Sequence, residues 1–386
     1  MNVLKWLAAL LAIISVSVCA EPYNEISQST PGVTNSTIIL GQSAAFSGPA
    51  AALGREYRRG AVTYFNYINQ EGGINGRRIF VISLDDGYEP KRTIANTKEL
   101  LEKDNVFSLF GYVGTPTSKA VLSQVSKHRV PFFAPYTGAE LLRTPVNPLI
   151  YNVRASYYQE TAALVEHMLQ QNKRNIAVFY QDDSYGKAGL EGVRRALENN
   201  NLSIGALGTV QRNTTNVSDA VNSISSSNPD GVIMIGAYAA CAEFIRQSKK
   251  AGMQKTTFMN VSFVGSKALV NDLWLESEGV VVSQVVPFPA STGIPIVAEY
   301  NKVSRMFFEQ NLPTYGSLEG YIAAKLFVEG LRKAGKNLTR NNFIAALDTL
   351  NKTNLGGFRI DWNRQNHNGS SFVDVTVIGD NSRWVY

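Results

Sequence analysis

Apolar runs alternate with amphipathic segments along most of the chain. Runs such as IAVFY and GVIMIG are continuously apolar, as is typical of strands buried on both faces. Segments with apolar residues at helical spacing lie between the runs. Strands that alternate with helices predict parallel sheets covered by helices. We expect strands at 36–44, 77–86, 105–112, 130–136, 175–183, 230–238 and 256–263, and helices at 55–70, 90–103, 116–127, 185–199 and 241–251.

The alternation pauses once, around PLIYNVRASYYQE, and then resumes. We interpret this pause as a first crossing of the chain between two lobes. In parallel sheets of this kind, ligands bind in the crevice beyond the carboxyl ends of the strands. Every predicted strand ends in polar or small residues, so the pattern predicts a binding crevice between the lobes.

The N-terminus predicts a secretory signal peptide. Lys5 precedes the apolar run WLAALLAIISVSVCA, which is short for a membrane span, and Val18 and Ala20 are suited to cleavage after residue 20. Residues 21–36 are polar and predict a flexible segment. A lipid anchor at Cys19 is an alternative that its preceding residues disfavour.

Cysteine content indicates the compartment. After cleavage, Cys241 is the only cysteine, so no internal disulfide can form. We therefore expect a bacterial periplasmic protein. No second apolar segment is long enough to cross a bilayer, which predicts a soluble mature protein.

Composition excludes several classes of function. Hydrophobic residues make up 44% of the chain and charged residues 18%, which is typical of a globular protein. The formal net charge of +6 is scattered in short clusters, so it predicts neither a nucleic-acid nor a membrane surface.

Catalytic signatures are missing from the sequence. The three histidines lack partners at metal-ligand spacing, and neither a phosphate-binding loop nor a G-x-S-x-G elbow occurs. Cys241 lies within a predicted helix and is interpreted as a packed thiol. We expect no catalytic residues, no metal and no cofactor.

The segment GYVGTPTS predicts a strand-to-helix turn rich in hydroxyl groups. Thr115 is a candidate N-cap with Pro116 in the first helical turn. The side chains of Thr115, Thr117 and Ser118 and the free N–H groups of such a turn suit a carboxylate. Helix capping alone explains the same residues, so both interpretations stay open here.

An ordered series of motifs resembles the periplasmic solute-binding proteins of the branched-chain amino acid type, which have the type I binding-protein fold. The motifs are FSGPAAALG, N-x-x-G-G-I-N-G, GTPTS, FAPYTGAEL, DDSYGKAG, IGAYAACAEFIRQSKKAG, GYIAAKLFVEGL and FRIDWNRQNHNGS, and the resemblance covers residues 37–386. The resemblance implies two Rossmann-like lobes joined by three crossovers. We place the N-terminal lobe at 37–154 with 287–370, and the C-terminal lobe at 155–286 with 371–386.

The resemblance also implies where the ligand lies. It places a carboxylate cradle at Thr115, Thr117 and Ser118, contacts after the next strand, and contacts from the second lobe. The further implied positions are Tyr136, Thr137, Tyr185 and Tyr238, with Ser47 at the cleft entrance and Leu53 beside the side chain of the ligand.

One position departs from the family pattern. Where the amino-acid binders carry an acid that pairs with the ligand's ammonium group, this chain has Ser262. An unpaired buried ammonium is costly. Either another acid, such as Asp183 or Glu243, supplies the charge, or the ligand is not an α-amino acid.

Aromatic residues at predicted strand ends and turns bear on the same question. Each alone is typical of packing, but together they suit a carbon-rich carboxylate. The set is Phe46, Tyr112, Tyr136, Tyr185, Tyr238 and Phe263. We keep both ligand classes open and favour a carboxylate without an obligatory ammonium.

The resemblance implies the substrate-binding component of an ABC transporter, a monomer that hands a small carboxylate ligand to a permease in the inner membrane. An alternative from a different class is a soluble periplasmic sensory subunit that reports to a membrane signalling partner, since one fold serves both uses. An enzyme is not expected.

Overall fold

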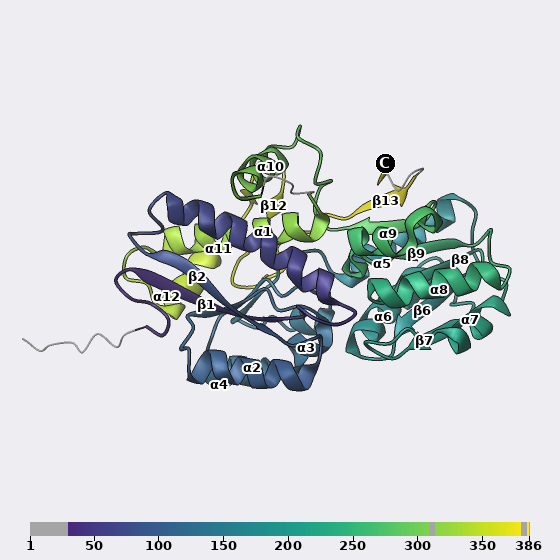
Figure 1. The fold of residues 1–386 in the computed structure, drawn as a ribbon, viewed down its shortest axis with the longest axis horizontal. Helices are drawn as coiled ribbons and strands as arrows, with labels where there is room; N and C mark the ends of the chain where they lie inside the picture. Colours follow the sequence, from purple (N-terminus) through teal and green to yellow (C-terminus); the bar gives the residue numbers. More distant parts are fainter. Residues whose placement is uncertain (1–29, 309–312, 380–383, 386) are drawn as a thin grey trace, which may run out of the picture.

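The structure, a computed structural model, describes residues 30–308, 313–379 and 384–385, and it has two α/β lobes side by side (Figure 1). The predicted signal peptide, Cys19 and most of the segment 21–36 lie outside the described residues. Within those residues, no helix has the length and apolar character needed to cross a membrane.

The first lobe is built on a five-stranded parallel sheet in the order β2-β1-β3-β4-β5. Helices α1 and α11 pack against each other on one face, and α2–α4 lie on the other (Figure 1). Its elements are β1 (Thr37–Ala44), α1 (Ala51–Gln70), β2 (Arg78–Asp85), α2 (Pro90–Glu102), β3 (Ser108–Phe110), α3 (Thr115–Ala120), α4 (Leu122–His128), β4 (Phe132–Phe133), η1 (Glu140–Leu142), β5 (Ile150–Tyr151), α10 (Pro295–Phe307), α11 (Tyr315–Ala334), α12 (Arg340–Leu347), β11 (Thr353–Asn354) and β12 (Arg359–Ile360).

The second lobe is built on a seven-stranded sheet in the order β14-β13-β10-β9-β8-β6-β7. Strands β6–β10 are parallel, as expected, whereas β13 and β14 pair antiparallel at one edge. Its elements are α5 (Tyr157–Gln170), β6 (Ile176–Gln181), α6 (Ser184–Glu198), β7 (Leu207–Val210), α7 (Ser218–Ser225), β8 (Gly231–Ile235), α8 (Tyr238–Lys250), β9 (Thr257–Asn260), η2 (Ser262–Val264), α9 (Ser266–Leu273), η3 (Trp274–Ser277), β10 (Val281–Gln284), β13 (Asp374–Ile378) and β14 (Trp384–Val385).

The chain passes between the lobes after β5, after β10 and after β12. The first passage, residues 152–156, ends in a capping box at the start of α5. There Ser156 accepts the N–H of Gln159, and the Gln159 side chain accepts the N–H of Ser156. The direction in which α5 leaves the crossover is therefore fixed by local hydrogen bonds.

Several predicted elements differ from the structure. The strand expected at 105–112 is reduced to β3, and the one expected at 256–263 ends at Asn260 and is followed by η2. The helix expected at 116–127 is divided in two at Val121, whose N–H reaches back three residues to the carbonyl of Ser118. The strand expected at 130–136 is reduced to Phe132–Phe133, because Ala134 adopts a left-handed φ of 50° that ends the extended run.

Candidate ligand-binding cleft

Aromatic rings from both lobes meet in the cleft between them. Phe263 of η2 lies 6.0 Å from Tyr88, 5.5 Å from Tyr136 and 4.7 Å from Tyr185, measured between ring centroids. Tyr157, at the start of α5, lies 5.3 Å from Tyr185. All five rings are buried. Because Tyr88 and Tyr136 belong to the first lobe and Phe263 and Tyr185 to the second, the two lobes are closed on each other.

Polar contacts join the lobes at the mouth of the cleft. Arg212, which follows β7, pairs with Glu89 of the first lobe at 2.9 Å and with Asp183 of its own lobe at 3.2 Å. The Asn213 side chain donates to Glu89 at 2.7 Å and to the carbonyl of Gly87 at 3.0 Å. The contacts with Glu89 and Gly87 join the two lobes, whereas the pair with Asp183 lies within the second lobe.

The turn of GYVGTPTS forms one wall of the cleft, with a different cap from the one expected. Gly114, with φ of 99°, is the N-cap, and Thr115 is already helical, so the prediction of a Thr115 cap is wrong. Glycine suits this φ, and a Cβ there would lie 2.2 Å from Cε2 of Tyr88. The cap position is therefore set by packing against the Tyr88 ring.

The three hydroxyl groups of this turn have different surroundings. Thr117 donates to the carbonyl of Gly114 at 2.9 Å and so serves its own helix. Thr115 is 2.7 Å from Thr137, which donates to the hydroxyl of Tyr157 at 3.2 Å. The Ser118 hydroxyl is buried without a hydrogen-bond partner among the described residues. Of the three, Ser118 has the hydroxyl left for a ligand.

The remaining predicted positions are distributed between the cleft and its surroundings. Tyr238 is half-buried at the mouth, where its hydroxyl accepts the Ala52 N–H at 3.5 Å across the cleft. Ser47 is exposed and donates to Asp85. Contrary to the prediction, Tyr112 does not face the cleft. Its hydroxyl is 2.9 Å from that of Thr97, on the sheet face covered by α2.

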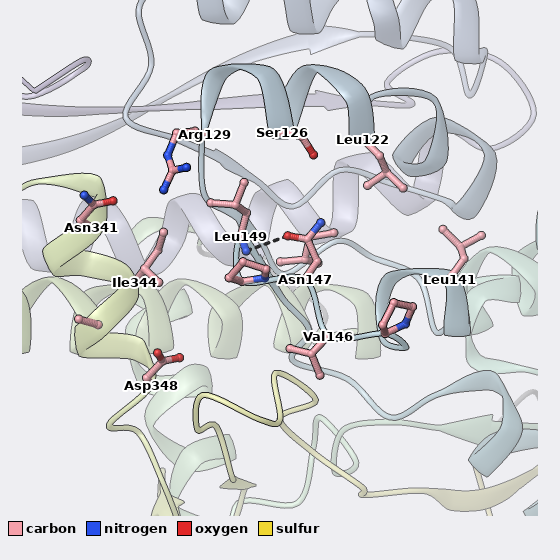
Figure 2. A pocket seen from close by; sticks show the side chains of 14 residues that line it. Leu122, Ser126, Arg129, Leu141, Val146, Asn147, Leu149, Asn341, Ile344 and Asp348 are labelled. Atoms are coloured by element: carbon pink, nitrogen blue, oxygen red, sulfur yellow. Dashed lines mark hydrogen bonds between the residues drawn. The ribbon is translucent and has the colours of Figure 1, made fainter.

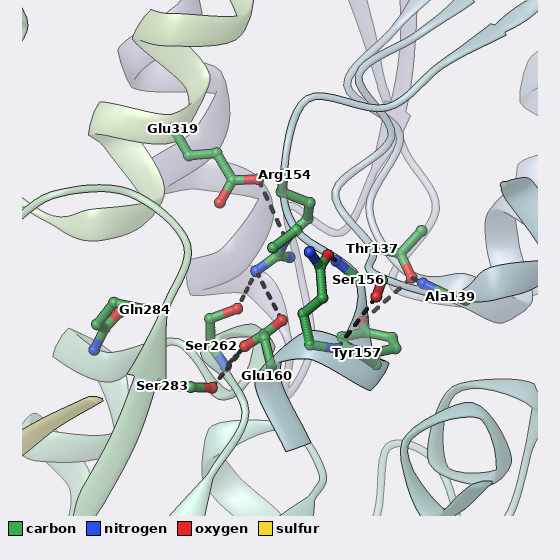
Figure 3. A network of polar contacts seen from close by, with 12 residues as sticks. Thr137, Ala139, Arg154, Ser156, Tyr157, Glu160, Ser262, Ser283, Gln284 and Glu319 are labelled. Carbon is green, nitrogen blue, oxygen red and sulfur yellow. Dashed lines mark hydrogen bonds and ion pairs between the residues drawn. The ribbon is translucent and has the colours of Figure 1, made fainter. Parts of the chain in front are cut away.

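Ser262 takes part in a buried polar network that joins both lobes to the first crossover (Figure 3). Arg154 of the crossover donates through Nη2 to the Ser262 hydroxyl. Its Nε lies 3.5 Å from Oε1 of Glu319 on α11, and its Nη2 lies 3.9 Å from Oε1 of Glu160 on α5. Glu160 also accepts the Ser262 N–H at 2.7 Å and the Ser283 hydroxyl at 2.7 Å. The network thus contacts both lobes at the hinge.

The network borders the aromatic cluster. The Arg154 guanidinium lies 4.7 Å from the centroid of the Tyr136 ring, a cation–π distance. Burial lowers the pKa of Arg154, but the carboxylates of Glu319 and Glu160 outweigh burial and raise it above its usual value. Burial raises the pKa of Glu319 to about 7, although Arg154 opposes this shift. Arg154 is therefore a permanent cation at the cleft, and Glu319 titrates near neutrality.

The two acids proposed as substitutes for the missing one lie elsewhere. Asp183 accepts the N–H of Tyr185 at 2.8 Å as the cap of α6 and pairs with Arg212. Glu243 pairs along α8 with Arg246 at 3.3 Å. Neither enters the network, so the prediction that one of them faces the ligand is not supported by this arrangement.

Sequence reasoning missed five residues of this region: Tyr88, Arg154, Tyr157, Glu160 and Glu319. The signal available was the crossover NVRASYYQE, where an arginine and a glutamate stand in the pause between the lobes. Glu319 had no such signal, because it lies within an ordinary helical pattern.

Other chemistry is not apparent in the described ranges. No group of three or more His, Cys, Asp and Glu side chains is placed to hold a metal there. Cys241 is buried in α8, as expected of a packed thiol, and burial raises its pKa. A groove of about 660 Å³ lies outside the cleft, between α4, residues 145–150 and α12, with Arg129 and Asp348 on its walls (Figure 2). None of the predicted site residues lines it.

Comparison with known proteins gives a consistent family. Residues 37–382 match the sequence profile of a family described as periplasmic binding protein. A curated relative, Leu/Ile/Val-binding protein homolog 7 of Brucella abortus (strain 2308), is 25% identical over 380 residues, covering 93% of this chain and 92% of the relative.

Solved structures share the fold. A possible leucine/isoleucine/valine-binding protein from Rhodopirellula baltica SH 1 superposes with a TM-score of 0.87 at 33% identity, covering 93% of this chain and 98% of that one. A fatty acid ABC transporter substrate-binding protein from Thermomonospora curvata superposes with a TM-score of 0.83 at 20% identity, covering 92% of each chain. The second likeness concerns the fold alone.

Proposed function

The chain belongs to the periplasmic binding protein family, and we propose that it is the periplasmic substrate-binding component of an ABC transporter, capturing a small carboxylate between its lobes. In this proposal the closed lobes deliver the ligand to a permease in the inner membrane. The names of two relatives, which describe binding of leucine, isoleucine and valine, support a solute-binding role.

The observation that carries the proposal is the meeting of the two lobes at the ends of the strands. Aromatic rings of both lobes pack against one another there, and a buried serine hydroxyl on α3 lacks a partner in the described part of the chain. Hydrogen-bond donors at the start of a helix favour an anionic group, and the aromatic faces favour a carbon-rich remainder. We infer that the carboxylate of the ligand contacts the Ser118 hydroxyl, with Thr115, Tyr136, Thr137 and Tyr185 around it.

Binding is tested with a panel of small carboxylates, amino acids and uncharged metabolites. Thermal shift gives the stabilisation, and calorimetry gives the affinity of each compound that stabilises the protein. Stabilisation confined to carboxylates supports the proposal, whereas no stabilisation by any compound of the panel contradicts it.

Substitution of Ser118 then locates the site. We expect Ser118→Ala to weaken binding of a carboxylate from the panel about 10-fold, the loss of one hydrogen bond to a charged group, with an unchanged melting temperature without ligand. Ser126→Ala, on the exposed side of α4, is the matched control. Equal affinities of the two variants would contradict a carboxylate site at α3.

A further inference from the structure

The Arg154 guanidinium has donor capacity that the protein does not use. Nη2 donates to Ser262 and Nε faces Glu319, but Nη1 is buried without a hydrogen-bond partner in residues 30–308, 313–379 and 384–385. The side chain is 1% exposed. A buried N–H group of a charged side chain is costly unless it meets an acceptor. Nη1 of Arg154 is thus suited to donate a hydrogen bond to an oxygen atom of a ligand at the edge of the cleft.

The charges around Arg154 do not favour an ammonium group. A second arginine, Arg143, is buried beside it and donates to the carbonyl of Arg154 at 2.8 Å. Two arginines, Arg143 and Arg154, and two acids, Glu160 and Glu319, form a buried group that is neutral when all four are ionised. Since burial raises the pKa of Glu319 to about 7, the group becomes positive below neutral pH. Within this buried group, an added ammonium would meet no net negative charge; the partly exposed Glu140 acts on Arg143 from outside the group.

Other carboxylates near the cleft already have partners. Asp183 pairs with Arg212, and Asp86 accepts the hydroxyls of Ser43 and Thr93 at 2.8 and 3.1 Å. Glu56, which lies near the Tyr136 hydroxyl, is hydrogen-bonded to Thr314 and is acted on by the charges of Arg59 and Lys267. Oε1 of Glu160 has no hydrogen-bond partner in the described part of the chain, but it lies 3.9 Å from Nη2 of Arg154 and so faces the charge of that arginine.

Building on the proposed function, we propose that the ligand carries an oxygen acceptor beside its carboxylate instead of an ammonium group, and that Arg154 binds this oxygen. The class comprises 2-oxo acids, 2-hydroxy acids and dicarboxylic acids. Arg154 is then the residue that determines specificity, because its planar N–H groups donate to an oxygen atom and its positive charge repels an ammonium. Ser262 orients the guanidinium through Nη2, the nitrogen other than the one assigned to the ligand.

The decisive comparison uses pairs of ligands that differ only beside the carboxylate. Calorimetry of the mature chain compares phenylpyruvate and phenyllactate with phenylalanine, and 4-methyl-2-oxopentanoate with leucine; malonate and succinate represent the dicarboxylic acids. We expect at least one oxygen-bearing acid to bind about 10- to 100-fold more tightly than its amino-acid counterpart, the range for one hydrogen bond to a charged group.

A variant pair assigns the preference to Arg154. Arg154→Gln with Glu319→Gln removes one positive and one negative charge, so the sum of buried charges is unchanged when both are ionised. We expect this double variant to lose the 10- to 100-fold preference. Arg194→Gln with Glu198→Gln, an exposed ion pair on α6, is the matched control and should keep it. Circular dichroism establishes that each variant is folded. The comparison of ligand pairs on the wild-type protein does not depend on either variant.

The outcomes separate this inference from the function it rests on. Tighter binding of phenylalanine or leucine than of their oxygen-bearing counterparts would overturn the inference and leave a solute receptor intact. A preference retained in the double variant would overturn the role of Arg154. If none of these compounds binds and the wider panel also gives no stabilisation, the proposed function itself fails.

Discussion

At the scale of single residues, the buried acids and arginines at the hinge are the least expected feature of the chain. Oε2 of Glu160 accepts the Ser262 N–H and the Ser283 hydroxyl, whereas Oε1 of Glu160 and Oε1 of Glu319 face Arg154 at 3.9 and 3.5 Å. A carboxylate with few donors in a buried place ionises reluctantly. The packing of the two lobes at the hinge therefore depends on pH through the ionisation of Glu319.

The stability of the protein should depend on pH through Glu319. The pKa of this carboxyl is about 7 in the folded chain and near its ordinary value of 4.5 in the unfolded chain. Because the folded pKa is raised, its contribution to stability is full below pH 4.5 and is lost as pH rises through 7. We expect Glu319→Gln to flatten this decline, by on the order of 3 kcal/mol at most.

Urea denaturation of both proteins at pH 5 and pH 8 measures this difference. Burial raises the pKa of Asp86 to about 6, so Asp86 also makes the free energy of unfolding fall with pH. This contribution is the same in both proteins, so the difference between them reports on Glu319. Identical slopes for wild type and Glu319→Gln would show that the carboxyl ionises normally in the folded state.

At the scale of elements, the close packing of α1 on α11 decides the shape of the first lobe. A Cβ at Gly320 would lie 2.0 Å from the carbonyl oxygen of Tyr57, and a Cβ at Gly60 would lie 1.7 Å from that of Ser317. Backbone atoms cannot move aside as a flexible side chain can. The two glycines therefore set the distance between the helices, and through α11 they set the position of Glu319.

We expect Gly320→Ala to destabilise the protein, against the ordinary trend. Alanine in a helix interior is favoured over glycine by roughly 1 kcal/mol, but overpacking against backbone costs about 1–3 kcal/mol. The clash exceeds the gain in propensity, so the free energy of unfolding should fall. Chemical denaturation followed by circular dichroism measures it, with the exposed Lys333→Ala on the same helix as the control. A more stable Gly320→Ala protein would mean that the helices separate readily.

At the scale of the whole molecule, closure joins surfaces that are far apart in the sequence. The rings of Tyr88 and Tyr136 meet Phe263 in the centre, and Arg212 meets Glu89 at the mouth. Contacts made only when the lobes are closed stabilise that arrangement and, with it, a ligand held inside. Their loss should weaken binding without altering the site itself.

We therefore expect Arg212→Ala to weaken ligand binding about two- to fivefold, as is usual for a partly exposed ion pair, and to lessen the effect of salt on affinity. Calorimetry at low and high salt with a ligand from the panel measures both. Arg194→Ala, whose partners Glu191 and Glu198 lie on its own helix, should bind as wild type does. An unchanged affinity of Arg212→Ala would mean that closure does not depend on this contact.

The sequence by itself determined the class of fold and the end of the sheets where the cleft lies. Continuous apolar runs such as IAVFY require burial on both faces, and local spacing sets where helices begin and end, so these features depend on neighbours in the chain. It also identified GYVGTPTS and the absence of an acid at Ser262.

Only the tertiary structure decided what surrounds Ser262. Arg154, Glu160 and Glu319 are separated by up to 165 positions along the chain, and they meet because the crossover, α5 and α11 converge at the hinge. Likewise, the Tyr112 side chain lies on the face of the sheet covered by α2, where its hydroxyl is hydrogen-bonded to that of Thr97. Burial, pairing and charge balance depend on such distant partners, which local pattern does not encode.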